Sequence, residues 1–128
     1  MNFNKFTIKA SEAVQEAHDL TLRQKNNQID VVHLLLAMLD QQDGFVPMIL
    51  KKMGKSVENL QSTLQGQLEK LSTVEGNMQI GVSQDLNKVF LEAENIMAKM
   101  GDSYVTTEHL FLAILKGSSE SKRACESE

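Results

Sequence analysis

His33 and His109 are the first residues that could do chemistry, because two imidazoles that meet in space can hold a transition metal ion. No Cys, third His or paired carboxylate lies at ligand spacing near either of them. Each stands near the start of a strongly apolar segment, where an imidazole can bond the helix cap or a nearby backbone carbonyl. We therefore predict two structural histidines and no metal site.

The triplet Gly54-Lys55-Ser56 resembles the end of a phosphate-binding loop. That motif requires a glycine five residues before Gly54, where the sequence has Ile49, and it follows a strand. A helix stop at Gly54 followed by a new cap is the better interpretation. Cys125 has no base that a motif would place beside it. We expect no catalytic residue and no cofactor in this segment.

The composition excludes several classes of partner. With 17 acidic and 13 basic side chains among 128 residues, the chain lacks the basic excess that phosphate backbones require, so we predict no nucleic-acid binding. The longest nearly apolar run, Val31 to Leu39, is too short to span a bilayer. The first nine residues lack the plan of a secretory signal, so we predict a cytoplasmic protein without membrane contact.

An internal repeat emerges when the chain is shifted by 76 positions, which places residues 6–40 on residues 82–116 without gaps. Seven of these 35 pairs are identical, where chance gives about two. They are Glu16/Glu92, Ala17/Ala93, His33/His109, Leu34/Leu110, Leu36/Leu112, Ala37/Ala113 and Leu39/Leu115. The repeat predicts a duplicated helical unit.

Each unit is expected to open with a long amphipathic helix, capped by Thr7 in the first copy and by Ser83 in the second. A helix that is apolar nearly all round follows, with Asp30 or Thr106 as its cap. The first unit continues with a short helix that has Pro47 at its first position. A fourth helix, capped by Ser56, presents a seam of apolar residues: Val57, Leu60, Leu64, Leu68 and Leu71.

These elements predict an all-α fold of two pseudo-symmetric repeats of four helices each, the second truncated at the C-terminus. The expected boundaries are residues 1–71 for the first repeat, 72–82 for a linker and 83–128 for the incomplete second repeat. The domain proper is expected to cover residues 1–117. Residues 118–128 are expected to form a poorly ordered tail or the start of a seventh helix.

Apolar residues near the end of the fifth helix could form an adaptable surface for unfolded segments, because methionine repacks easily. The predicted groove consists of Ile96, Met97, Met100 and Tyr104. The alternative is that the two methionines belong to the core.

The duplicated unit, the opening Met1-Asn2-Phe3-Asn4-Lys5-Phe6-Thr7 and the stretch Gly101-Asp102-Ser103-Tyr104-Val105-Thr106-Thr107-Glu108-His109-Leu110 resemble the Clp N-terminal domain family. The opening and the linker residues Val74-Glu75-Gly76 are more similar to the ClpB-type disaggregase branch than to the ClpC-type unfoldase branch. The resemblance covers residues 1 to about 117.

The resemblance implies a mobile N-terminal domain on a homohexameric, ATP-driven machine that threads unfolded or aggregated polypeptides through its pore. ATP and magnesium would then act only in downstream modules. It also implies that the positions of Thr7, Asp102 and Glu108 are linked to chaperone activity. Asp102 and Glu108 would orient the turn before the sixth helix or bind basic groups of a substrate.

Two other functions stay open. The ClpC-type branch docks adaptor proteins and recognises phosphorylated arginine through a Glu before the His of each repeat. Here Glu108 precedes His109, but Val32 precedes His33, so a symmetric pair of such sites is not expected, whereas a single site stays open. The third alternative is a stand-alone helical regulator.

Overall fold

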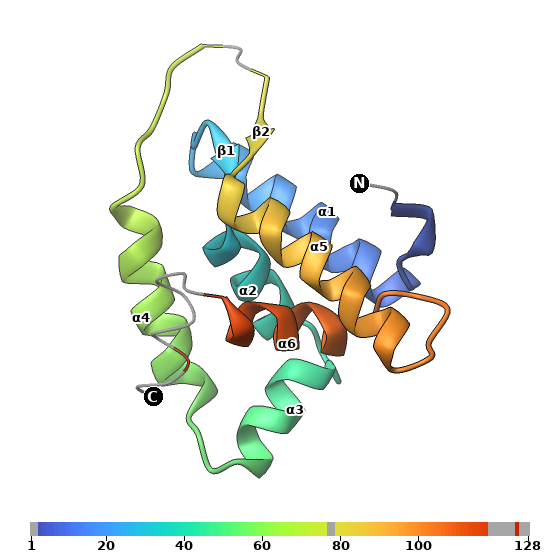
Figure 1. Ribbon diagram of the computed structural model, residues 1–128. Coiled ribbons are helices and arrows are strands. Elements are labelled where there is room, and N and C mark those ends of the chain that lie inside the picture. Colours follow the sequence, from blue (N-terminus) through green and yellow to red (C-terminus); the bar gives the residue numbers. More distant parts are fainter. Residues whose placement is uncertain (1–2, 77–78, 118–124, 126–128) are drawn as a thin grey trace.

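The computed structural model describes residues 3–76, 79–117 and 125 of the chain (Figure 1). Their order is a 3-10 helix η1 (Phe3–Lys5), α1 (Ile8–Arg23), β1 (Gln28–Ile29), α2 (Val31–Leu39), α3 (Phe45–Lys52), α4 (Val57–Glu69), β2 (Gly81–Val82), α5 (Gln84–Lys99) and α6 (Thr107–Lys116). The prediction of an all-α fold is confirmed. Its one addition is the pair β1 and β2, two parallel strands of two residues each.

Hydroxyl and carboxylate caps begin the helices where the sequence predicted them. Thr7, Ser56, Ser83 and Thr106 each accept a hydrogen bond from a backbone N–H of the first turn, and Asp30 does so for α2. The prediction for α3 was wrong, because the helix begins at Phe45 and Pro47 is its third residue. Proline is tolerated there because the N–H groups of a helix's first turn have no acceptor within the helix.

The core lies around α2 and α6, which cross the middle of the molecule (Figure 1). Eight of the nine residues of α2 are buried, as expected for a helix that is apolar nearly all round. Small residues on α1 bring its backbone close to α2, namely Ala10, Ala13 and Ala17. The predicted seam of α4 packs inward at Leu60, Leu64 and Leu68, while Val57 and Leu71 are half-buried against the core.

Two short backbone crossings tie the repeats together, and they are related by the same shift of 76 positions. Phe6 pairs in parallel with Val105, and Val82 pairs in parallel with Ile29. The N–H of Thr7 donates to the carbonyl of Val105 at 2.9 Å, and the N–H of Ser83 donates to that of Ile29 at 2.9 Å. The entry to each long helix is therefore anchored on the entry to the short helix of the other repeat.

The predicted tail or seventh helix at 118–128 lies outside the described residues, apart from Cys125. That cysteine is buried, and Lys55 Nζ donates to its backbone carbonyl at 3.2 Å. Residues 77–78 of the predicted linker also lie outside the described residues.

Candidate functional site

The turns that follow α1 and α5 have the same backbone geometry. Lys25 and Gly101 hold equivalent positions with positive φ angles of 58° and 74°. The next residue donates its N–H back into the helix, from Asn26 to the carbonyl of Thr21 and from Asp102 to that of Met97. The side chains of Asn26 and Asp102 consequently stand at equivalent places in the two repeats.

Each of these side chains is bonded to the histidine of its own repeat. His33 Nδ1 accepts from the N–H of Asp30 at 2.8 Å, and its Nε2 lies 2.9 Å from Asn26 Oδ1. His109 Nδ1 accepts from the N–H of Thr106 at 2.9 Å, and its Nε2 lies 2.8 Å from Asp102 Oδ2. Because Nδ1 accepts in both rings, Nε2 carries the proton and donates. Both histidines therefore close the cap of a short helix.

The two histidines differ in the charge beside them. His33 meets a neutral, buried amide, and burial lowers its pKa below 6.5 even though the Asp30 carboxylate opposes that shift. His109 meets the Asp102 carboxylate, whose side chain is 45% exposed. The first repeat thus holds a neutral, covered pair, and the second presents a carboxylate to solvent.

Stability is expected to fall in acid because of His33. Its folded-state pKa lies below the ordinary value of 6.5, so the unfolded chain takes up this proton first as the pH falls. The contribution is fully present above about pH 6.5 and is lost as the pH falls toward the folded-state pKa. Urea unfolding at pH 7.5 and pH 5.5 should show a smaller loss for His33→Gln than for the unchanged chain. Equal losses in the two proteins would contradict this assignment, and His18→Gln provides the control.

The second-repeat turn, defined here as Gly101–Thr106 between α5 and α6, carries exposed apolar and acidic side chains together. Tyr104 is 56% exposed and Met100, just before the turn, is 50% exposed. Glu108 is half-exposed in the first turn of α6, and its carboxylate has no partner among the described residues. The turn projects from the edge of the molecule as the orange loop of Figure 1.

Thr7 contacts the second-repeat turn through a backbone hydrogen bond and not through its side chain. Its Oγ1 accepts from the N–H of Ala10 at 3.2 Å, which caps α1, and its N–H donates to Val105 within the turn. Of the predicted groove, Met100 and Tyr104 are on the surface. Ile96 is only 6% exposed and belongs to the core, and Met97 is half-buried against it, so the groove of all four residues stays a prediction.

The first repeat has different side chains at the equivalent positions. Gln24 and Gln28 replace Met100 and Tyr104, Asn26 replaces Asp102, and Val32 replaces Glu108. Asn26 was missed by the sequence analysis, although the shift of 76 positions places it on Asp102. At these four positions, the apolar and acidic side chains therefore occur in the second repeat alone.

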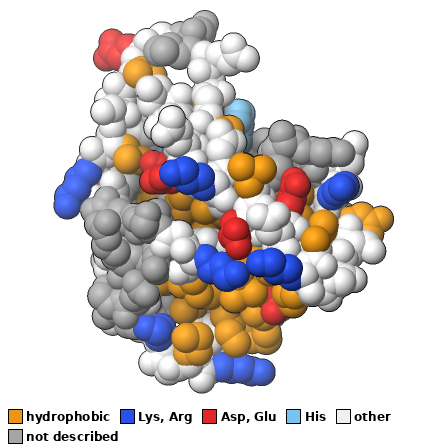
Figure 2. Space-filling view, viewed as in Figure 1, with side chains coloured by type: hydrophobic (Ala, Val, Ile, Leu, Met, Phe, Trp, Pro, Cys, Tyr) orange, Lys and Arg blue, Asp and Glu red, His pale blue; other side chains and the backbone are white. Residues whose placement is uncertain are grey.

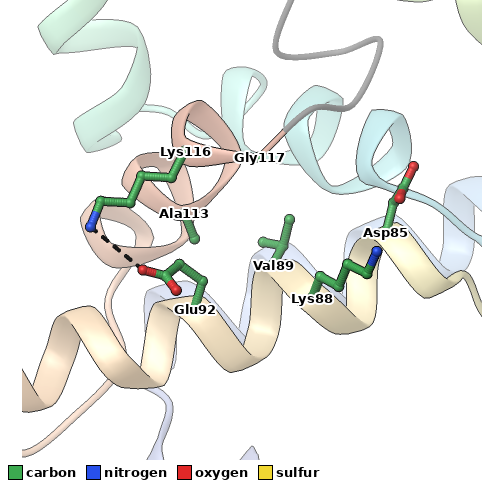
Figure 3. A pocket seen from close by; sticks show the side chains of 7 residues that line it. All are labelled: Asp85, Lys88, Val89, Glu92, Ala113, Lys116 and Gly117. Carbon is green, nitrogen blue, oxygen red and sulfur yellow. Dashed lines mark hydrogen bonds and ion pairs between the residues drawn. The ribbon is translucent and has the colours of Figure 1, made fainter.

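A cleft between α5 and α6 is a second candidate (Figure 3). Its apolar floor contains Val89 and Ala113, and Lys116 Nζ lies 3.5 Å from Glu92 Oε1 across one side. Asp85 and Lys88 line the cleft farther along α5 in the view of Figure 3. These side chains form a charged rim on an apolar floor.

Apolar side chains also gather on the lower part of the face shown in Figure 2, with Lys side chains at their border. Met48 and Met53 of the α3 region are exposed, and Lys51 and Lys52 lie between them in the sequence. Within residues 3–76, 79–117 and 125, no three His, Cys, Asp or Glu side chains are grouped as metal ligands would be. No helix in this part of the chain has the length and apolar character to cross a membrane.

The fold defines a helical domain of two repeats. The family model of the Clp repeat (R) N-terminal domain matches residues 5–126. The ClpB chaperone of Porphyromonas gingivalis is 37% identical over 115 residues, which are 90% of this chain and 13% of that protein. The ClpB chaperone of Clostridium perfringens is 29% identical over 119 residues, which are 90% of this chain and 14% of that protein.

The fold is shared with solved N-domains of several Clp proteins. The N-terminal domain of Hsp104 from Candida albicans superposes with a TM-score of 0.82 at 24% identity, covering 95% of this chain and 78% of that one. The chain belongs to the Clp repeat N-terminal domain family, the non-catalytic N-terminal domain of Clp/Hsp100 chaperones. It spans about one seventh of the length of these ClpB relatives.

Proposed function

We propose that this chain is the substrate-engaging N-terminal domain of a ClpB-like ATP-dependent protein disaggregase, and that it binds unfolded or aggregated polypeptide. The supporting observation is the second-repeat turn with its flanking residues: Met100, Asp102 and Tyr104 are exposed, and Glu108 follows in the first turn of α6. Apolar side chains that repack easily suit segments of varied sequence, and carboxylates favour basic groups. The ClpB relatives support this branch of the family.

The same proposal extends to the protein of which this domain forms a part. ATP and magnesium act in modules outside these residues, the parent assembles as a homohexamer, and it works in the cytoplasm. Within the domain, Thr7 supports the second-repeat turn through its bond to Val105, whereas Asp102 and Glu108 face the polypeptide. The domain contributes binding, and the chemistry of ATP hydrolysis lies elsewhere.

The double variant Tyr104→Ala, Glu108→Gln is expected to bind unfolded polypeptide about tenfold more weakly, because it removes an aromatic anchor and one of the two charges. Fluorescence anisotropy with labelled, reduced and carboxymethylated α-lactalbumin measures the affinity. Met53→Ala is the matched control, since Met53 is 57% exposed but lies beyond α3. Equal weakening by the control, or tighter binding of native α-lactalbumin, would argue against the proposal.

Adaptor docking is the second candidate, supported by the solved complex of a ClpV N-domain with a VipB peptide. That structure superposes with a TM-score of 0.83 at 18% identity and covers 98% of this chain and 79% of its own. An adaptor-docking domain would bind one folded partner saturably and would bind generic unfolded chains little. The same anisotropy measurement therefore distinguishes the two functions.

A further inference from the structure

The turn of the first repeat is already occupied by a segment of the chain itself. Residues 72–74 of the linker run antiparallel to it, with Thr73 bridged to Asn26. The N–H of Val74 donates to the carbonyl of Lys25 at 2.8 Å, and Asn26 Nδ2 donates to the carbonyl of Ser72 at 3.0 Å. An extended segment thus uses the Lys25–Asn26 backbone as an edge, and it covers Asn26.

The equivalent edge of the second repeat is uncovered by the described residues. Gly101 has the same left-handed conformation as Lys25, but no described residue donates to its carbonyl. Residues 101–104 are all exposed. The carbonyl of Gly101 can therefore accept a hydrogen bond from the backbone of an extended peptide, as the carbonyl of Lys25 does from Val74.

We propose that an extended segment of the bound polypeptide docks along Gly101–Asp102 in the way that residues 72–74 dock along Lys25–Asn26. This inference rests on the proposed function and specifies the contact through which the polypeptide is bound. A backbone N–H of the polypeptide donates to the Gly101 carbonyl, as the N–H of Val74 does to Lys25. Met100 and Tyr104 flank this edge and contact the apolar side chains of the segment.

The first repeat has Asn26 where the second has Asp102, and this difference determines which peptide segments the Gly101–Asp102 edge prefers. Asn26 has an amide that donates to a peptide carbonyl, whereas the Asp102 carboxylate only accepts and already receives one bond from His109. In the same docking mode the carbonyl equivalent to that of Ser72 receives no donor from Asp102, and a lysine or arginine side chain next to that carbonyl supplies the compensating contact with the carboxylate. Glu108 adds a second negative charge in the first turn of α6. The preferred segment is therefore extended and mainly apolar, with a basic residue at the position equivalent to Ser72.

The probe is a labelled peptide with the sequence of residues 70–76, in its original form and with Ser72→Arg. The 128-residue chain should bind the arginine peptide about three- to fivefold more tightly, which is the effect of one exposed ion pair. A third peptide with Ser72→Glu should bind more weakly than the original. In a ¹⁵N-labelled chain, amide shifts should change at Gly101–Tyr104 and stay constant at Lys25–Asn27.

The variant Asp102→Asn reproduces the side chain of the first repeat, which already pairs with a histidine, and so it preserves the cap. It should abolish the preference for the arginine peptide. Shift changes away from residues 100–105, or the same peptide order in Asp102→Asn, would overturn the inference. If labelled unfolded α-lactalbumin still binds in that case, the proposed function stands without this edge. If the unfolded protein does not bind the unchanged chain, the proposed function fails and this inference fails with it.

Discussion

Replacing Phe6 by Ala is expected to lower the free energy of unfolding by about 3–5 kcal/mol. Phe6 is buried, pairs its backbone with Val105 and packs edge-to-face on Phe90 with 5.9 Å between ring centroids. The substitution leaves a cavity at the crossing where the first repeat is anchored on the second. Urea denaturation followed by circular dichroism at 222 nm measures the loss.

The second crossing supplies a matched control, because Val82 is equivalent to Phe6 but is 39% exposed. Val82→Ala keeps the backbone pairing with Ile29 and removes little buried surface, so a loss of about 0.5 kcal/mol is expected. Similar losses for the two variants would contradict the conclusion that the Phe6 side chain contributes more to stability than the exposed side chain of Val82.

His33→Ala is expected to destabilise the chain by about 3 kcal/mol, because it leaves a cavity and removes the partners of one part-buried and one buried polar group. Those groups are the N–H of Asp30 and the Oδ1 of Asn26. His109→Ala should cost about 1 kcal/mol less, since water can reach the exposed carboxylate of Asp102 after the imidazole is removed.

The comparison of the two histidine variants is most direct by urea denaturation at pH 7.5, with His18→Ala as the surface control. A loss of less than about 0.5 kcal/mol is expected for His18, which is half-exposed on α1. If His109→Ala lowered the free energy of unfolding more than His33→Ala, this would contradict the conclusion that Asn26 is covered and Asp102 is exposed.

Local features of this fold are readable from the sequence, because they depend on neighbouring residues. The caps at Thr7, Ser83 and Thr106 and the nearly all-apolar α2 follow from residues within one or two helical turns. The start of α3 was predicted wrongly from Pro47, because proline is accepted anywhere in the first turn of a helix and so marks no single position.

Contacts between distant residues are what the sequence does not reveal. The crossings at Phe6 and Val82 are one or two residues long and carry no periodicity, and the cover of Asn26 by Ser72 joins residues 46 positions apart. Ile96 was predicted as a groove residue because it precedes Met97 and Met100 in the sequence, but the packing of α5 on α6 buries its side chain. The repeat shift predicted equivalent backbones, and only the structure shows that one turn is covered and that the other is left uncovered by residues 3–76, 79–117 and 125.

The most direct test of the account is to map where an unfolded polypeptide binds on the ¹⁵N-labelled chain. Titration with reduced, carboxymethylated α-lactalbumin should change the amide shifts of the second-repeat turn and of Glu108, and should leave Asn26 and Val32 unchanged. Native α-lactalbumin should change neither set. Equal changes in the two repeats, or changes confined to Met48 and Met53 near α3, would contradict the claim that polypeptide binding belongs to the second repeat.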